Sequence, residues 1–224
     1  PVASGYLLPP KAIVDILDAP PPPTAELSPA RDTVALLDRA SMPSIAELAQ
    51  PMHRLAGVRI NPRTNGPHRF TRYRGLTLKV VADGTERKVT LPPAPALAWV
   101  GFSPDGRRAA FTHTRDTGVE LWIADTATSS AKAVTPAQLN AALGTPCTWV
   151  GDGASLLCAF VDPARGAAPA APTAPNGPNV QESRGRVAPT ATVQDMLGSV
   201  HDEALFEYFA TSQLAFVDAA TGQR

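Results

Sequence analysis

Basic side chains gather in one stretch of the sequence that contains no acidic residue. Between Glu47 and Asp83 the charged residues are Arg54, Arg59, Arg63, Arg69, Arg72, Arg74 and Lys79. A guanidinium group binds a carboxylate through two parallel hydrogen bonds. The stretch is therefore either a solvated basic surface, or a group in which Arg59 and Arg63 face a cleft and bind a carboxylate of a substrate or a partner domain.

Other catalytic or ligand-binding patterns are absent from the sequence. No serine has glycine at both second neighbours, as a nucleophile elbow requires. Neither a His-Glu-x-x-His or Cys-x-x-Cys metal pattern nor a phosphate-binding loop of the Gly-x-x-x-x-Gly-Lys type occurs. We therefore expect no catalytic residue, no metal site and no cofactor within this sequence.

The histidines have no local partner pattern, so a structural or solvated role is favoured over a catalytic one. The cluster His201-Asp202-Glu203 fits the first turn of a helix, where carboxylates are stabilised by the positive end of the helix dipole. The four histidines are His53, His68, His113 and His201.

Cys147 and Cys158 lie on either side of the Gly-Asp-Gly sequence in CTWVGDGASLLC. If a hairpin folds about Asp152 and Gly153, the two cysteines face each other on adjacent strands, close enough to form a disulfide. Two small buried thiols are the alternative. A disulfide would indicate an exported protein.

Charge and hydropathy exclude several classes of partner. The formal net charge is zero, so no overall field attracts nucleic acid or an anionic membrane. No apolar run approaches the ~20 residues of a membrane span, and no signal segment opens the chain. The chain begins at Pro1 and ends at Arg224 just after a turn-like Ala-Thr-Gly, so we expect it to be part of a longer protein.

Short strands separated by tight turns dominate the pattern. Asp-Gly and Thr-Gly pairs suit the positive φ of tight hairpin turns. Four strands are predicted within about forty residues, at 96–102, 107–114, 119–124 and 131–135. This pattern of four short strands and tight turns is typical of one blade of a β-propeller.

The same unit recurs along the chain. Trp149 to Val161 repeats the pattern of Trp99 and the strand after it, and from Asp105 to Asp152 is about one propeller period. Upstream, 27–37 and 76–91 read as two hairpins of an earlier blade. Downstream, Leu214 to Asp218 repeats the third strand, Leu121 to Asp125.

Two insertions interrupt this rhythm, at about 41–75 and about 163–209. The first begins with a short helix, in which Ser44 and Glu47 form a capping box. The second opens with RGAAPAAPTAPNGPN, a mobile surface loop by composition, and closes with a helix at 199–209 that buries Leu205, Phe206 and Phe209. A third helix is expected at 136–143, capped by Thr135.

The sequence predicts an all-β fold: a partial β-propeller of about three four-stranded antiparallel blades with short helical insertions. Each blade is a sheet that cannot bury both faces alone, so the whole chain, 1–224, reads as the amino-terminal arc of a larger propeller. The Ser-Pro-Asp-Gly turns and Trp99, Trp122 and Trp149 are interpreted as turn-forming and inter-blade packing elements.

Three long phrases resemble a known family. GYLLPPKAIVDILDAPPPPTAELSP at 5–29, PSIAELAQPMHRLAGVRINPRTNGPHR at 43–69 and HDEALFEYFATSQLAFVD at 201–218 resemble the propeller of prolyl oligopeptidase family serine peptidases, in the glutamyl endopeptidase-like branch. The resemblance covers nearly the whole chain. It implies that a propeller covers a carboxyl-terminal α/β-hydrolase domain, which is absent from this chain and holds a Ser-Asp-His triad.

The resemblance also implies cleavage of peptides or proteins after glutamate, so the expected partners are a peptide or protein substrate and the hydrolase domain of the same polypeptide. The fragment alone should be inactive. Two other readings stay open: a propeller used as a protein-interaction module, and a polyanion binder through the arginine-rich stretch. Neutral charge and aromatics confined to strand patterns weigh against the last one. The family and the possible disulfide favour a bacterial periplasmic or secreted location.

Overall fold

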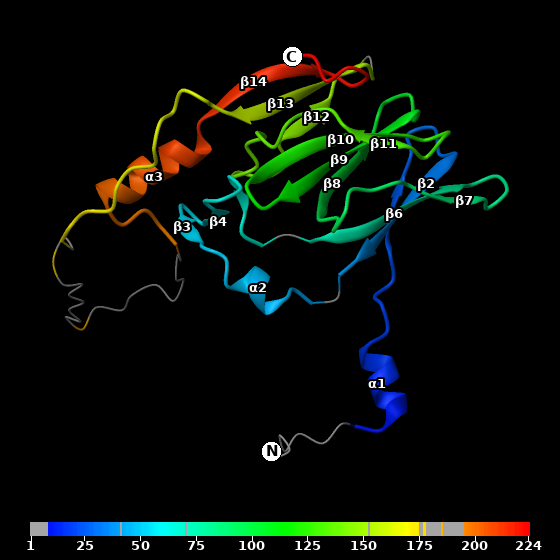
Figure 1. Cartoon of the computed structure of the whole chain (residues 1–224), viewed down its shortest axis with the longest axis horizontal. Helices are drawn as coiled ribbons and strands as arrows, with labels where there is room; N and C mark the ends of the chain where they lie inside the picture. The colour runs from blue at the N-terminus through cyan, green and yellow to red at the C-terminus, as the bar shows by residue number, and fades with distance from the viewer. Residues whose placement is uncertain are drawn as a thin grey trace.

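The computed structural model describes residues 9–40, 42–69, 71–151, 153–174, 177, 185 and 195–224. Short antiparallel strands form most of the ordered structure, with few helices (Figure 1). The helices are α1 (Lys11–Leu17), α2 (Ile45–Leu48) and α3 (Val200–Ala210). The strands are β1 (Thr24–Leu27), β2 (Thr33–Arg39), β3 (His53–Leu55), β4 (Val58–Asn61), β5 (Gly66–Pro67), β6 (Tyr73–Val80), β7 (Glu86–Lys88), β8 (Leu97–Phe102), β9 (Arg108–Arg115), β10 (Gly118–Asp125), β11 (Ala131–Ala133), β12 (Cys147–Trp149), β13 (Ser155–Val161) and β14 (Ser212–Asp218).

Three units with the same strand pattern follow one another along the chain. We call β1-β2-β6-β7 the first sheet, β8-β9-β10-β11 the second sheet and β12-β13-β14 the third sheet, although hydrogen bonding between β6 and β8 makes the first two parts of one eight-stranded sheet. The first and second sheets are joined at one residue pair, Tyr73 and Leu97. The all-β fold with blade-like antiparallel sheets is therefore confirmed, and the third sheet contains three strands within the described residues.

The turn between the first two strands of each sheet is the same in all three. The amide of Ser28 donates to the carbonyl oxygen of Thr33 (2.8 Å), that of Ser103 to Arg108 (2.9 Å) and that of Val150 to Ser155 (2.9 Å). Each turn also contains a residue with positive φ, which glycine adopts without steric cost. These residues are Arg31 (59°), Gly106 (72°) and Gly153 (67°). The turn at 27–32 therefore repeats the Ser-Pro-Asp-Gly turn with Arg31 in place of the glycine, as the hairpin predicted at 27–37 requires.

A second turn follows the third strand of each sheet. A carboxylate organises it in two cases: Asp125 accepts from the amide of Thr128 (2.8 Å), and Asp218 accepts from the amide of Thr221 (2.7 Å). The positive-φ position of these two turns is Ser129 (58°) and Gly222 (75°). The predicted repeat of the third strand is therefore present down to the turn that ends it.

Two apolar cores lie between successive sheets, and alternate residues of the second sheet supply both. In β9, Ala110 faces the core shared with the third sheet, whereas Ala109 and Phe111 face the core shared with the first sheet. In β10, Leu121 and Ile123 belong to the core with the third sheet. Side chains of a strand point alternately to opposite faces, so this alternation shows that the second sheet is packed on both sides.

The tryptophans pack as predicted, between sheets. Trp99 and Trp149 contact the core between the second and third sheets, and the indole Nε1 of Trp149 donates to the carbonyl oxygen of Gly101 on β8 (3.0 Å). Trp122 contacts the core between the first and second sheets and stacks on Phe111, with ring centroids 6.1 Å apart.

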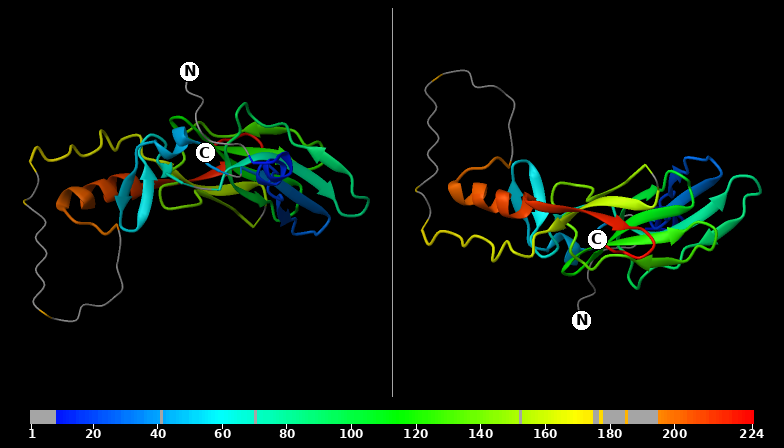
Figure 2. Two further views of the ribbon diagram at one scale, coloured as in Figure 1. Left: turned by 90° about the horizontal axis from the view of Figure 1, so that it is seen from below. Right: turned by 90° about the horizontal axis from the view of Figure 1, so that it is seen from above.

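Both insertions leave the sheets at the same place, the connection between the second and third strands. In the first sheet this connection contains α2 and the small sheet β3-β4-β5; in the third sheet it contains α3. In the second sheet β9 and β10 are joined directly by a tight turn. Figures 1 and 2 show α3 beside β3 and β4 at one end of the molecule. The predicted capping box of Ser44 and Glu47 is present at α2.

Helix α3 confirms the prediction for 199–209. Ser199 caps its first turn, and Leu205 and Phe209 are buried against the side chains of β3 and β4, with Phe206 partly buried beside them. The small sheet β3-β4-β5 and helix α1, which projects away from the sheets in Figure 1, were not predicted from the sequence. Part of the proline-rich stretch and Asp152, at the centre of the predicted hairpin turn, lie outside the described residues.

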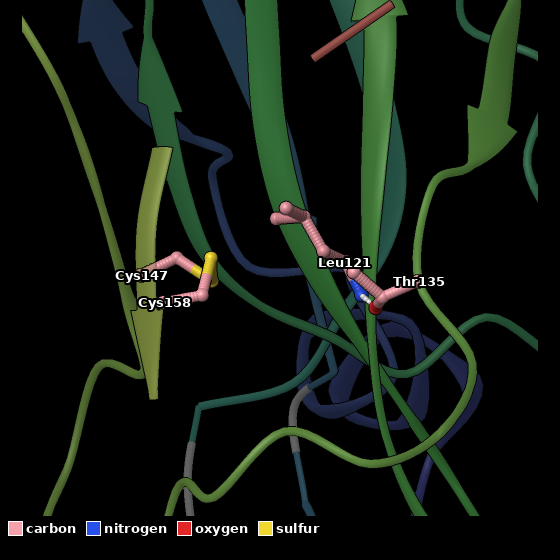
Figure 3. The surroundings of a disulfide bond; sticks show 4 residues. All are labelled: Leu121, Thr135, Cys147 and Cys158. Carbon is pink, nitrogen blue, oxygen red and sulfur yellow. Dashed lines mark hydrogen bonds between the residues drawn. A yellow bond between two sulfur atoms is a disulfide. The ribbon is translucent and has the colours of Figure 1, made fainter. Parts of the chain in front are cut away.

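The prediction of a helix at 136–143 is wrong, because this segment is an irregular connection between β11 and β12. Its amide groups bond to neighbouring strands, for example Leu139 to the carbonyl oxygen of Val119 (3.0 Å) and Asn140 to that of Ala159 (2.9 Å). The hydroxyl of Thr135, the expected cap, instead accepts from the amide of Leu121 (2.9 Å; Figure 3). Tertiary partners for the backbone outweigh the local helix signal.

No helix in the described part of the chain is long and apolar enough to cross a membrane.

Candidate functional site

The arginine-rich insertion meets the second insertion through Asp195. The carboxylate of Asp195 lies 3.3 Å from the guanidinium Nε of Arg59 and 3.8 Å from Nη1 of Arg54. Its side chain is 11% exposed, and its carbonyl oxygen accepts from the amide of Gly57 (3.0 Å). Arg59 therefore already holds a carboxylate of this chain, which the sequence could not show because the two residues are 136 positions apart.

Arg63 differs from Arg59 in this respect. Its side chain is exposed, and no ion pair to it is found within the described residues. Its amide donates to the side-chain oxygen of Asn61 (3.0 Å), which orders the loop between β4 and β5. The structure thus separates the two arginines that the sequence placed together: one is paired and one is open to solvent.

A buried polar junction ties both insertions to the irregular segment between β11 and β12. The side-chain amide of Asn140 donates to the carbonyl oxygens of Phe209 and Thr211, each at 2.9 Å, and its oxygen accepts from the side-chain amide of Asn65. The guanidinium of Arg165 donates to Asn65 (2.6 Å) and lies 4.2 Å above the ring of Tyr208. Because both asparagines are buried, these bonds fix the position of α3 relative to the first insertion.

A hollow of about 300 Å³ lies beside α2, where the end of β2 approaches the segment before β6. Arg39, Arg69 and Arg72 line it together with Glu47 and His68. Arg72 donates to Glu47 (2.8 Å), and Glu47 also accepts from the backbone amide of Ser44 (2.7 Å). The bond from Ser44 lowers the pKa of the Glu47 carboxyl, so Glu47 is ionised at neutral pH.

The histidines are not grouped into a site. His113 is buried, its Nδ1 accepts from the amide of Ala96 (3.3 Å), and burial lowers its pKa. The Nε2–H of His68 donates to the carbonyl oxygen of Gln50 (3.0 Å), and the ring of His53 packs near Phe209. His201 lies in the first turn of α3. These contacts indicate structural roles for the histidines.

Cys147 and Cys158 form a disulfide that links β12 to β13 (Figure 3). The two residues are directly paired across the strands, with Cα atoms 4.1 Å apart. Both are buried in the core between the second and third sheets. Of the two alternatives left by the sequence, the structure contains the bridge rather than two thiols.

The outer face of the third sheet is apolar and open. Leu214 and Phe216 of β14 are 68% and 62% exposed, and they lie opposite Ala159 and Leu157 of β13. Their neighbour Val217 points the other way, into the core with the second sheet. A surface of this kind on an antiparallel sheet is expected where another sheet packs.

Potential metal ligands are not gathered into one group in the described residues. No group of three or more His, Cys, Asp or Glu side chains that could hold a metal ion occurs among them. What the site does contain is a set of arginines held by acidic residues, an apolar sheet face and a disulfide.

Comparison with known proteins finds two relatives that match almost the whole of this chain. No family model matches it. It is 37% identical over 224 residues to a rice protein (Oryza sativa subsp. japonica) named "Probable glutamyl endopeptidase, chloroplastic", and 36% identical over 227 residues to the Arabidopsis thaliana protein of the same name. These matches cover 94% and 95% of this chain but 24% and 23% of the relatives, so the chain spans about a quarter of their length.

Among solved structures, the Pyrococcus horikoshii acylaminoacyl peptidase is 19% identical, with a TM-score of 0.33, over 62% of this chain and 16% of that one. The comparison therefore depends on the sequence relatives, whose similarity covers almost all of the chain. Along almost all of its length the chain is therefore similar to the amino-terminal β-propeller portion of glutamyl endopeptidase-like serine peptidases of the prolyl oligopeptidase family.

Proposed function

We propose that this chain forms part of a propeller that covers the catalytic domain of a serine endopeptidase and limits access to it. The observation that carries the proposal is the 37% identity to a glutamyl endopeptidase along 94% of the chain. In this proposal the Ser-Asp-His triad lies in an α/β-hydrolase domain of the same polypeptide and acts by base-assisted acyl transfer with an oxyanion hole. The substrate is a peptide or protein cleaved after glutamate.

The open face of the third sheet supports a role within a larger ring. The second sheet buries its residues on both faces, whereas Leu214 and Phe216 of the third sheet are left in water. Burial of such side chains is worth about 25 cal/mol per Å² of apolar surface. A further sheet of the propeller packed on this face would bury them, as the third sheet covers the second.

The test compares the full protein with this chain alone. The full protein is expected to hydrolyse a glutamyl peptide and to react with a fluorophosphonate probe for activated serines, whereas this chain should do neither. A protein that lacks this chain should accept larger substrates, because the cover is gone. Absence of both activity and labelling in the full protein would overturn the proposal and favour a propeller that serves only as an interaction module.

Arg59 and Arg63 remain proposed contacts for an acidic substrate or partner. Because Asp195 already pairs with Arg59, Arg63 is expected to contribute more. Arg63→Ala in the full protein should lower kcat/KM for an acidic peptide more than for a neutral peptide of the same length. Equal losses on the two peptides would remove Arg63 from substrate recognition.

A further inference from the structure

The hollow beside α2 has an excess of positive charge. Arg72 is matched by Glu47, at 2.8 Å. Arg39 and Arg69 also line the hollow, and within the described residues neither has an ion-pair partner. The residues that line this space of about 300 Å³ therefore include three arginines and one carboxylate, that of Glu47, which is already paired with Arg72.

The wall that carries these charges is fixed in place. The capping box at α2 holds both Glu47 oxygens, one by the amide of Ser44 and one by Arg72. On the other side, the backbone amide of Ala40, just after β2, donates to the carbonyl oxygen of Arg72 (3.1 Å). These bonds order the backbone of the wall around Glu47, Ala40 and Arg72, from which the exposed side chains of Arg39 and Arg69 extend.

The rest of the wall gives the hollow two further properties. Ala40, Pro43 and Leu48 make part of it apolar. His68, which is 7% exposed, also lines it, and its Nδ1 has no hydrogen-bond partner within the described residues. Because Nε2 donates to Gln50, Nδ1 of the neutral ring is an acceptor, so the carboxylate oxygens of a ligand would be held by the arginines of this wall and not by His68.

We propose that this hollow is a binding site for a small carboxylate with a short aliphatic stem. Guanidinium groups bind carboxylates through paired, charge-assisted hydrogen bonds, and the apolar part of the wall suits methylene groups. The volume lies at the lower end of the range for small-molecule sites. The inference goes beyond the proposed function, because it concerns a bound ligand of this chain and not the peptidase reaction.

The test is calorimetric titration of the full protein with glutarate, the uncharged glutaramide and inorganic phosphate. Glutarate should bind, and the double variant Arg39→Ala/Arg69→Ala should weaken its binding at least about tenfold, because it removes two groups that form charge-assisted hydrogen bonds. Arg107→Ala, a change of an exposed arginine in the turn between β8 and β9, is the matched control and should leave binding unchanged.

A second variant is expected to act in the opposite direction. Glu47→Gln keeps the capping box, since glutamine also fills that position, but removes the negative charge from the wall. Glutarate should then bind severalfold more tightly, a result that damage to the fold would not produce. Circular dichroism of each variant monitors folding.

Several outcomes would overturn the proposal. Binding of glutaramide as tight as that of glutarate would remove the charge argument, and unchanged binding in the double arginine variant would place the ligand elsewhere. Phosphate binding that depends on these arginines and exceeds glutarate binding would replace the carboxylate assignment. None of these readouts requires peptidase activity, so failure of the proposed function and failure of this site are distinguishable.

Discussion

The second and third sheets are built from the same sequence pattern but differ in what covers them. Phe111 of β9 is fully buried between the first and second sheets, and Leu121 of β10 is fully buried between the second and third. In the third sheet Val217 is buried in the same way, yet Phe216 beside it is mostly exposed. The difference shows that burial of a strand here depends on its neighbouring sheets and not on its own composition.

The largest expected effect comes from a matched pair of phenylalanines. Phe111→Ala should lower the free energy of unfolding of this chain by about 3–5 kcal/mol, because it leaves a cavity between two sheets. Phe216→Ala should change it by less than about 0.5 kcal/mol, as for other exposed positions. Urea titration followed by tryptophan fluorescence measures both.

The same pair reports on what covers the third sheet in the full protein. If a further sheet packs on Phe216 there, Phe216→Ala should lower the free energy of unfolding as much as other large-to-small changes in a core do. A cost that stays below about 0.5 kcal/mol in the full protein would show that this face is left uncovered.

The disulfide strengthens the third sheet alone, so its removal should have the next largest effect. Cys147 and Cys158 are 11 residues apart, and closing a loop of this length stabilises a protein by about 2–3 kcal/mol through the unfolded state. Cys147→Ala/Cys158→Ala should lower the free energy of unfolding by that amount. Addition of a reductant should destabilise the original chain and leave the double variant unaffected; destabilisation of both would point to another cause.

The shared turn allows a smaller test between the first and second sheets. Arg31 adopts the positive φ that Gly106 adopts in the equivalent turn. Arg31→Gly should stabilise the chain by about 0.5–1 kcal/mol, since an L-residue pays for this conformation. Gly106→Ala should destabilise it by about 1 kcal/mol; the added methyl group meets only ordinary contacts at 3.8 Å, so backbone strain is the main cost. Thermal melts of the two variants should shift in opposite directions.

The smallest expected effect concerns the carboxylates that end the third strands. The amide of Thr128 lowers the pKa of Asp125, and the amide of Thr221 lowers the pKa of Asp218. A carboxyl group with a lowered folded-state pKa stabilises the fold above its unfolded pKa, about 3.9, and this contribution is lost as pH falls through the folded-state pKa.

Asp125→Asn/Asp218→Asn should therefore make the acid side of the stability profile shallower. Urea midpoints measured from pH 6 down to pH 2.5 test this. A profile with unchanged slope would mean that the other carboxyl groups with lowered pKa dominate acid unfolding, namely Asp32, Glu47, Asp83 and Asp105.

Local patterns were enough to predict the repeated sheets, the two sets of turns, the capping box at α2 and the helix α3. Each depends on residues close together in sequence: the alternation in β9 and β10, the Ser-Pro-Asp-Gly turn, and Ser44 with Glu47. The family resemblance came from long phrases of sequence and was confirmed by the relatives.

The candidate site was only partly predictable. The arginine-rich stretch was visible in the sequence, but the acidic partner of Arg59 comes from the second insertion, and the hollow beside α2 joins the end of β2 to residues about thirty positions later. The sequence therefore named arginines of interest without separating paired from unpaired ones.

By itself the sequence determined the strands and their turns, because alternation and positive-φ positions act within a few residues. Only the tertiary structure decided the conformation of 136–143. The carbonyl oxygens of Val119, Ala159 and Asn65 accept hydrogen bonds from backbone amides of this segment, which in a helix would bond within the segment itself. The tertiary structure also decided the disulfide, the pairing of Asp195 with Arg59, and which sheet faces are covered. Except for the disulfide, whose cysteines are 11 residues apart on adjacent strands, those outcomes depend on contacts between segments far apart in the chain, which no local preference specifies.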